Sequence, residues 1–312
     1  MRIPKKLPSR LGDHFSIRTA NSAGVGRSRR DANDLHRPFR GTRSKSVPET
    51  FRQTIACYQP RMRPEHDFAG RTAARIWGLP LPWFWKSDEP LDIAVPPHLN
   101  PPKIAEVKGR RLASARVRRW TVSGVPVVDP ISALFTCAPE LTVNEAVTII
   151  DALITDADNY PDLGPGRPLA TVEDIEGRLV VWGRFPRSGT VRKAIPLARP
   201  QVESPKETET RLLITDAGFG EPVVQHEVFD GGLFVARVDL AYPELKIAIE
   251  YEGDGHRRDP KQWRTDIRRQ RDLEDRGWIV IRLTQDDLGN RGAALLARLR
   301  GAITSARAGD AR

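Results

Sequence analysis

The stretch that decides the fold is VARVDLAYPELKIAIEYEGDGHRRDP, residues 235–260, in which two apolar runs carry acidic residues. Both runs are rich in β-branched residues, which is typical of strands, and the YPEL segment between them predicts a hairpin connection. Asp239 and Glu250 lie inside these runs, flanked by Val, Leu and Ile. Because burying an unpaired carboxylate is costly, the pattern predicts a compensating partner, commonly a cation.

The segments on either side predict an α/β sheet domain. Ser204 as an N-cap, Pro205 at the first helical position and Glu207 three residues after the cap predict a helix. Three strands, a helix, a buried strand and a closing helix are then expected at 223–229, 233–242, 246–253, 259–278, 279–284 and 286–303. The order α-β-β-β-α-β-α places antiparallel strands before an α-crossover and a final strand.

A hairpin between the second and third strands brings their acidic side chains together. Cross-strand neighbours lie roughly 5 Å apart, and Glu250 and Glu252 share one face because residues two apart point the same way. Hard divalent cations take oxygen ligands, and Mg²⁺ usually takes one or two carboxylates plus waters. Asp239, Glu250 and the backbone carbonyl of Tyr251 therefore form the expected site for Mg²⁺ or Mn²⁺.

Other candidates near this site each have a simpler interpretation as well. Glu207 is a further ligand, directly or through water, or only the carboxylate of a capping box. Glu252-Gly253 and Asp254-Gly255 are candidates for the site or ordinary turn residues. His256 is a candidate for proton transfer, since its unperturbed pKa lies near neutrality, or a solvent-exposed hydrogen-bonding residue.

Charge separates the N-terminal part from the rest. The chain has 312 residues and a net charge of +10, from 50 Lys and Arg against 40 Asp and Glu. Residues 1–63 hold fifteen Lys and Arg and four Asp and Glu, which is about +11, so the remainder is close to neutral. Such a basic region suits a polyanion, and arginine in particular suits phosphate. The alternative is a solvated tail.

The predicted organisation has three parts. Residues 1–36 show no sustained apolar period and are expected to be flexible, residues 37–198 to form an α+β module, and residues 199–312 to form the α/β domain. No apolar run approaches the length of a membrane span, and a cytoplasmic location is expected. Cys57 and Cys137 are too isolated for a disulfide framework or a metal knuckle.

Residues 204–288 resemble the Vsr-like endonuclease domain of the PD-(D/E)XK superfamily. The resemblance rests on SPKETETRLLITDAGFGEP, ARVDLAYPELKIAIEYEGDGH and DIRRQRDLEDRGWIVIRLTQDDL. It implies a restriction-endonuclease-like fold, metal-binding acids at Asp239 and Glu250, and Glu207 as the helix acid. It also implies a DNA endonuclease that hydrolyses phosphodiesters with Mg²⁺ or Mn²⁺, with Glu252 orienting water.

The chain departs from this family at the third motif position, where lysine is common and Glu252 stands here. The role of a general base or charge stabiliser is therefore open. Arg268, Arg269 and Arg271 on the following helix are candidates for binding nucleic acid; Arg269 either faces the site or pairs with Asp266 on the helix surface.

A weaker resemblance links the N-terminal two-thirds to the AbiEi-type antitoxin module, which binds DNA through a winged helix. It rests on RPFRGTRS, AGRTAARIWGLPLP and VVDPISALFTCA. The helix in AGRTAARIWGLPLP is either a core helix, which its Ala, Ile and Trp favour, or a recognition helix. The second functional hypothesis is accordingly a non-catalytic DNA-binding regulator of toxin–antitoxin type. A homodimer and a toxin partner are both compatible with the sequence.

Overall fold

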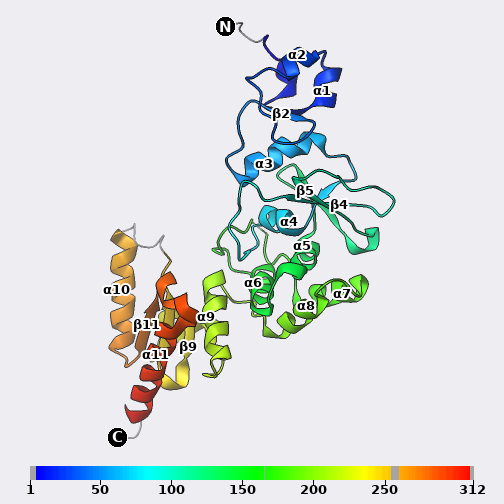
Figure 1. The fold of residues 1–312 in the computed structure, drawn as a ribbon. Helices are drawn as coiled ribbons and strands as arrows, with labels where there is room; N and C mark the ends of the chain where they lie inside the picture. The colour runs from blue at the N-terminus through cyan, green and yellow to red at the C-terminus, as the bar shows by residue number, and fades with distance from the viewer. Residues whose placement is uncertain (1–4, 165, 254–259, 310–312) are drawn as a thin grey trace. The chain divides into compact units, whose positions relative to one another are not determined.

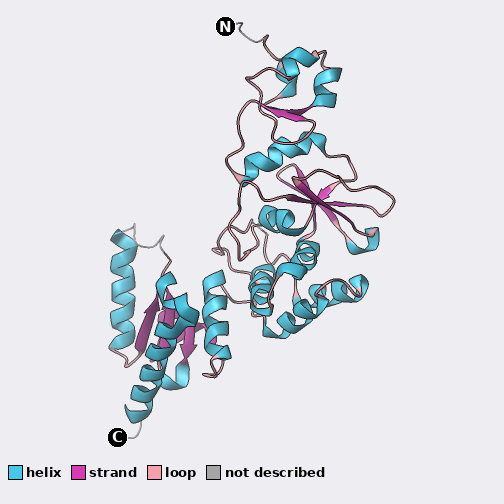
Figure 2. Ribbon diagram, viewed as in Figure 1, coloured by secondary structure: helices cyan, strands magenta, loops and turns pink. Residues whose placement is uncertain are grey.

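The structure, a computed structural model, describes residues 5–164, 166–253 and 260–309. These residues fall into two compact units, whose elements are drawn in Figures 1 and 2. The first unit takes Met1–Trp77, Leu81–Glu140 and Ile175–Pro186, and the second takes Gly78–Pro80, Leu141–Asp174 and Arg187–Arg312. The second unit thus begins well before the boundary expected at residue 199.

The N-terminal segment differs from the flexible tail expected over residues 1–36. It contains β1 (His14–Ser16), α1 (Ile17–Ser22) and α2 (Arg27–Arg30), and β1 pairs antiparallel with β2 (Thr42–Ser44), which follows the segment. They enclose a small buried cluster made of Leu11, Phe15, Ala20, Val25 and Leu35. Helices of six and four residues are too short to produce a sustained apolar period, which explains why the sequence pattern missed them.

The rest of the first unit is built on a five-stranded sheet with the order β5-β4-β3-β7-β6. Its strands are β3 (Asp67–Phe68), β4 (Leu91–Val95), β5 (Val107–Arg111), β6 (Arg119–Val122) and β7 (Val125–Val128). Its helices are α3 (Phe51–Tyr58), α4 (Gly70–Trp77), α5 (Pro130–Cys137) and most of α7 (Val172–Trp182). Asp129 caps α5 by accepting a 3.0 Å hydrogen bond from the Ser132 N–H, as Asp129-Pro130 predicts.

Helix α4, from the AGRTAARIWGLPLP segment, has the character of a core helix. Thr72, Ala73 and Ala74 are buried. Arg75 pairs with Glu89 at 3.1 Å, so its charge is already neutralised inside the unit. These contacts favour the core interpretation of this segment over the recognition helix.

The second unit is a mixed α/β assembly with the expected order of elements. After α6 (Val143–Ile154) and α8 (Ser188–Ala194) come α9 (Pro205–Asp216), β8 (Val223–Asp230), β9 (Leu233–Tyr242), β10 (Ile247–Tyr251), α10 (Pro260–Glu274), β11 (Ile279–Leu283) and α11 (Gln285–Gly309). The sheet order is β11-β10-β9-β8. Strands β8, β9 and β10 are antiparallel neighbours, whereas β10 and β11 are parallel and joined through α10. The predicted hairpin between β9 and β10 is therefore present.

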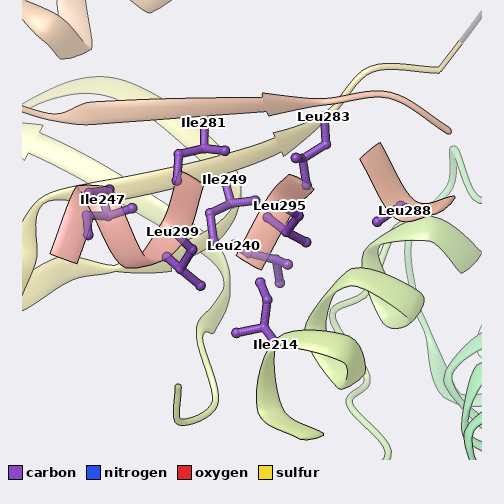
Figure 3. Close-up of a cluster of buried hydrophobic side chains, with 10 residues drawn as sticks. Ile214, Leu240, Ile247, Ile249, Ile281, Leu283, Leu288, Leu295 and Leu299 are labelled. Carbon is purple, nitrogen blue, oxygen red and sulfur yellow. The ribbon is translucent and has the colours of Figure 1, made fainter. Parts of the chain in front are cut away.

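Two apolar clusters cover the two faces of this sheet. On one face Ile247 and Ile249 pack with Ile214 of α9 and with Leu295 and Leu299 of α11 (Figure 3). On the other face Ala248 packs with Leu273 of α10 and with Trp278. Each buried Leu or Ile side chain contributes about 1.5–3 kcal/mol, so the sheet is a firm support for polar groups at its strand ends.

Two smaller expectations concern cysteine and the membrane. Cys57 and Cys137 are buried free thiols. Within residues 5–164, 166–253 and 260–309, no helix has both the length and the apolar character that crossing a bilayer requires.

Candidate functional site

Asp239 lies at a point where the pairing of β9 is interrupted on both sides. The ladder to β8 contains His226↔Val238 and Val224↔Leu240 but not the intervening pair with Gln225. The ladder to β10 ends at Leu240↔Ile249, one step before Asp239 would face Glu250. The half-buried carboxylate is left to accept a 2.9 Å hydrogen bond from the Tyr251 N–H.

The backbone is irregular at this point. Gln225, the neighbour that drops out of the ladder, has a φ of 49°, which is uncommon for a residue with a side chain. Val238 and Leu240 pack into different clusters although residues two apart normally share a face. Such breaks in a ladder re-aim side chains and are frequent beside active sites.

Glu250 supplies a second, more deeply buried carboxylate from β10. Its side chain lies 2.8 Å from Nη2 of Arg269 on α10, whose own side chain is 37% exposed. Glu250 Oε1 makes this ion pair without hydrogen-bond geometry and is a buried oxygen lacking a hydrogen-bond partner among the described residues. A buried carboxylate oxygen in that condition can still take a cation.

Glu207 supplies a third buried carboxylate from the first turn of α9. Ser204 caps the helix as predicted, because its hydroxyl accepts a 3.2 Å hydrogen bond from the Glu207 N–H. Glu207 Oε2 accepts hydrogen bonds from the Glu203 N–H at 3.0 Å and from Gln225 Nε2 at 2.9 Å. Glu207 therefore binds the backbone one residue before the N-cap rather than the Ser204 N–H of a capping box, and Gln225 ties it to the irregular part of β8.

The electrostatics identify Asp239 as the strained member of the set. Burial, together with the negative charges of Glu207 and Glu250, raises the pKa of Asp239 to about 8, and the Tyr251 N–H and Arg269 oppose that rise. Burial also raises the pKa of Glu207, although its hydrogen bonds oppose that effect. An Asp239 carboxylate repelled by Glu207 and Glu250 is one that a divalent cation would stabilise.

The carboxylates of Asp239, Glu250 and Glu207 are not arranged as a complete set of metal ligands. In the part of the chain that it describes, no group of three or more His, Cys, Asp or Glu side chains is placed to hold a metal ion. The residues fit a cation by their chemistry, with all-oxygen donors and one buried carboxylate oxygen without a hydrogen bond. Asp239 and Glu250 would hold such an ion, with Glu207 beside them.

Glu252 follows β10 and forms an ion pair with Arg282 of β11. In the parallel register Arg282 lies opposite Glu250, so the acidic end of β10 has a basic residue on the neighbouring strand β11. Arg282 Nη1 also donates to Gln270 Oε1 at 3.2 Å. No local sequence pattern indicates Arg282, because the parallel pairing of β10 with β11 is what places it there.

The remaining predicted residues divide into three groups. Arg269 faces Glu250, which decides between its two interpretations. Arg268 and Arg271 are exposed on α10, as binding to nucleic acid would require. His256 lies outside the described residues, and the Tyr251 carbonyl stays a prediction while the Tyr251 N–H is seen to contact Asp239.

A polar hollow of about 790 Å³ opens beside Glu207 and Gln225. Gln201, Glu203, Gln225, His226 and Arg237 are among the residues that line it. Glu203 is held there by Arg237 at 2.6 Å and by Asn159 at 2.8 Å. No local sequence pattern indicates this hollow, because the 156–159 loop, residues 201–203, β8 and Arg237 of β9 form it jointly.

Comparisons with known proteins give relatives without an assigned activity. No family model matches the chain. The uncharacterized proteins Rv2248 and MT2308, from two strains of Mycobacterium tuberculosis, are each 32% identical over 108 residues, which is 35% of this chain and 40% of theirs. The chain thus matches less than half the length of these relatives. The crystal structure of the RV2827C protein from Mycobacterium tuberculosis covers 65% of this chain and 76% of its own, with 17% identity and a TM-score of 0.38.

Proposed function

We propose that the second unit is a metal-dependent nuclease that hydrolyses phosphodiester bonds, with DNA as the expected substrate. The observation that carries this proposal is Asp239, which is held at a break in two strand ladders against two further carboxylates. A structural acid would be expected to face mainly donors, whereas this one, besides the Tyr251 N–H and Arg269, lies near two like charges. The resemblance to Vsr-like domains, the α-β-β-β-α-β-α order and the acids on α9, β9 and β10 support the same conclusion.

In this proposal the residues of the chain divide the work among them. Asp239 and Glu250 bind the divalent cation, which supplies Lewis-acid stabilisation of the phosphate and activation of water. Glu207 orients water from the α9 side, fixed by its contacts to Gln225 and to the Glu203 backbone. Glu252 accepts a proton or orients the attacking water, with Arg282 holding it in place. Arg268, Arg269 and Arg271 bind the nucleic-acid backbone.

The test is cleavage of labelled DNA and RNA with Mg²⁺, Mn²⁺ or EDTA. We expect cutting with either metal and none in EDTA. Asp239→Ala and Glu250→Ala should each reduce the rate by at least roughly a hundredfold, since one well-placed charge-stabilising group is worth that much. Asp286→Ala, which removes an acid from the exposed start of α11, is the matched control and should cut at the wild-type rate.

A second function has a specific observation in its favour. Both acids at the end of β10 already face arginines, Glu250 with Arg269 and Glu252 with Arg282, and Glu252 replaces the common lysine. Such neutralised acids suit a DNA-binding regulator that kept the fold without turnover. If the wild type binds DNA yet cuts no substrate with either metal, this function replaces the nuclease.

A further inference from the structure

The positive charge of Arg269 acts on two carboxylates of the site, those of Glu250 and Asp239. Glu250 is buried, and a buried carboxylate left without a cation is costly. Arg269 supplies that cation at 2.8 Å, and it lies near enough to Asp239 to lower the pKa of that carboxyl. The guanidinium therefore stands where the charge of a divalent ion would be needed.

The ion pair between Arg269 and Glu250 is one in which another cation can replace the guanidinium. Its side chain is 37% exposed, so its guanidinium reaches solvent, where an ion pair contributes little. The pair also lacks hydrogen-bond geometry at Glu250 Oε1. By contrast, Asp151 and Arg211 in the same unit form a fully buried ion pair with several hydrogen bonds. The first arrangement can open at small cost once another cation takes the place of Arg269 at Glu250, and the second cannot.

A guanidinium released from Glu250 has an obvious new partner in this site. It sits on α10 between the exposed arginines 268 and 271 and carries donors in a fork that matches phosphate oxygens. A cation that binds Asp239 and Glu250 displaces it by competing for the same carboxylate oxygen. The freed charge then faces the solvent side, from which a phosphodiester arrives.

We propose that Arg269 is a shared counter-ion, which neutralises Glu250 before the cation binds and a phosphate oxygen of the nucleic acid afterwards. This inference rests on the proposed function. It makes cation and nucleic acid bind cooperatively, because each ligand favours the same position of Arg269. Linkage requires the coupling to be reciprocal, so each ligand strengthens the other by the same factor.

The test measures binding without cleavage, with Ca²⁺ as the probe cation. Calorimetry gives the affinity of the full chain for Ca²⁺ without DNA, and fluorescence anisotropy at fixed ionic strength gives its affinity for a labelled DNA duplex with and without Ca²⁺. For the wild type we expect Ca²⁺ to tighten DNA binding about tenfold. Arg269→Met should bind Ca²⁺ alone severalfold more tightly, and its DNA affinity should change less than about twofold on adding Ca²⁺.

Two variants complete the design. Arg268→Met removes an equal charge from an exposed position of the same helix; it should weaken DNA binding with and without Ca²⁺ and keep the wild-type ratio. Arg269→Lys should restore part of the coupling, and circular dichroism checks that each variant is folded. The inference is overturned if Arg269→Met keeps the full ratio or binds Ca²⁺ more weakly than the wild type.

Cleavage by the wild type with Mg²⁺ distinguishes a failure of the shared counter-ion from a failure of the proposed nuclease function. If the wild type cuts and Arg269→Met keeps the wild-type coupling, the shared counter-ion is wrong and the nuclease stands. If the wild type neither binds Ca²⁺ nor cuts, both are wrong.

Discussion

Two acids of the second unit, the buried Asp151 and the half-buried Asp239, contrast in what surrounds them. Asp151 on α6 accepts hydrogen bonds from the Arg199 N–H at 2.7 Å, the Thr208 hydroxyl at 2.8 Å and Arg211 Nη2 at 3.1 Å. Among the described residues, Asp239 accepts one from the Tyr251 N–H, and its charged surroundings are the carboxylates of Glu207 and Glu250 with Arg269. Burial raises the pKa of Asp151 to about 6 and that of Asp239 to about 8.

The contrast distinguishes an acid that holds the fold together from an acid kept for a ligand. Donors converge on Asp151, and Arg211, equally buried, extends the network to Glu221 at 2.7 Å. At Asp239 the strand ladders open and like charges gather instead. The surroundings of Asp151 thus stabilise the fold, whereas those of Asp239 lower its stability, as is common at functional sites.

The largest effect on stability should come from breaking the Asp151 network. Asp151→Ala removes the buried partner of Arg211 and leaves it only the more exposed Glu221 of this network, so we expect a loss of about 3–5 kcal/mol in the free energy of unfolding. Urea denaturation measures it. Asp156→Ala, an exposed acid just after α6, is the control and should change stability by less than about 0.5 kcal/mol. A small loss at Asp151 would remove the distinction between the two acids.

The pH dependence of stability should separate the two acids next. A carboxyl whose folded pKa lies above its unfolded value binds a proton on folding, so its contribution to stability falls as pH rises between those two values. For Asp151 that window runs from about 4 to about 6, and for Asp239 it extends to about 8. In EDTA the wild type should lose stability between about pH 6 and 8, by at most about 1.4 kcal/mol per pH unit for Asp239.

Asp239→Asn should flatten that decline, whereas Asp151→Asn should leave the decline above about pH 6 in place. Urea denaturation in EDTA at several pH values gives the slopes. Glu207 contributes in the same direction, because its pKa is also raised. An unchanged slope in Asp239→Asn would contradict the raised pKa of Asp239 on which the candidate site depends.

A smaller effect is expected at Gln225, which connects the two sides of the site. Gln225→Ala removes the hydrogen bond to buried Glu207, and we expect a loss of about 1.5–3 kcal/mol. Gln225→Gly removes the same bond but suits the φ of 49°, so it should be about 1 kcal/mol more stable than the alanine variant. Thermal and urea denaturation compare the two; equal stabilities would mean that the backbone there carries no strain.

The smallest effect should be the coupling between Glu252 and Arg282. Both side chains are about 30% exposed, at 27% and 31%, so the pair should contribute less than about 1 kcal/mol to stability. A double-mutant cycle with Glu252→Gln and Arg282→Met isolates that term. A coupling of several kcal/mol would place this pair with the Asp151 network rather than with the open site.

Local patterns in the sequence predicted the elements that local physics determines. The apolar runs, the Ser204 cap and the YPEL connection predicted α9, β9 and β10 and put Asp239 and Glu250 at one end of a hairpin. They did not predict the left-handed Gln225, the Arg282 beside Glu252 or the Asp151 pair with Arg211. Each of these depends on residues that are brought together by pairing or packing across 12 or more positions in the chain, for which a local pattern carries no signal.

The interleaving of the two units along the chain has a consequence for proteolysis. Gly78–Pro80 belongs to the second unit although it lies within the first part of the chain, and Ile175–Pro186 belongs to the first unit although it lies within the second. A protease that nicks the chain near residue 140 therefore produces two fragments, each of which contributes a segment to the other's fold. Such nicked protein should elute from a sizing column as one species and separate into two bands only under denaturing electrophoresis.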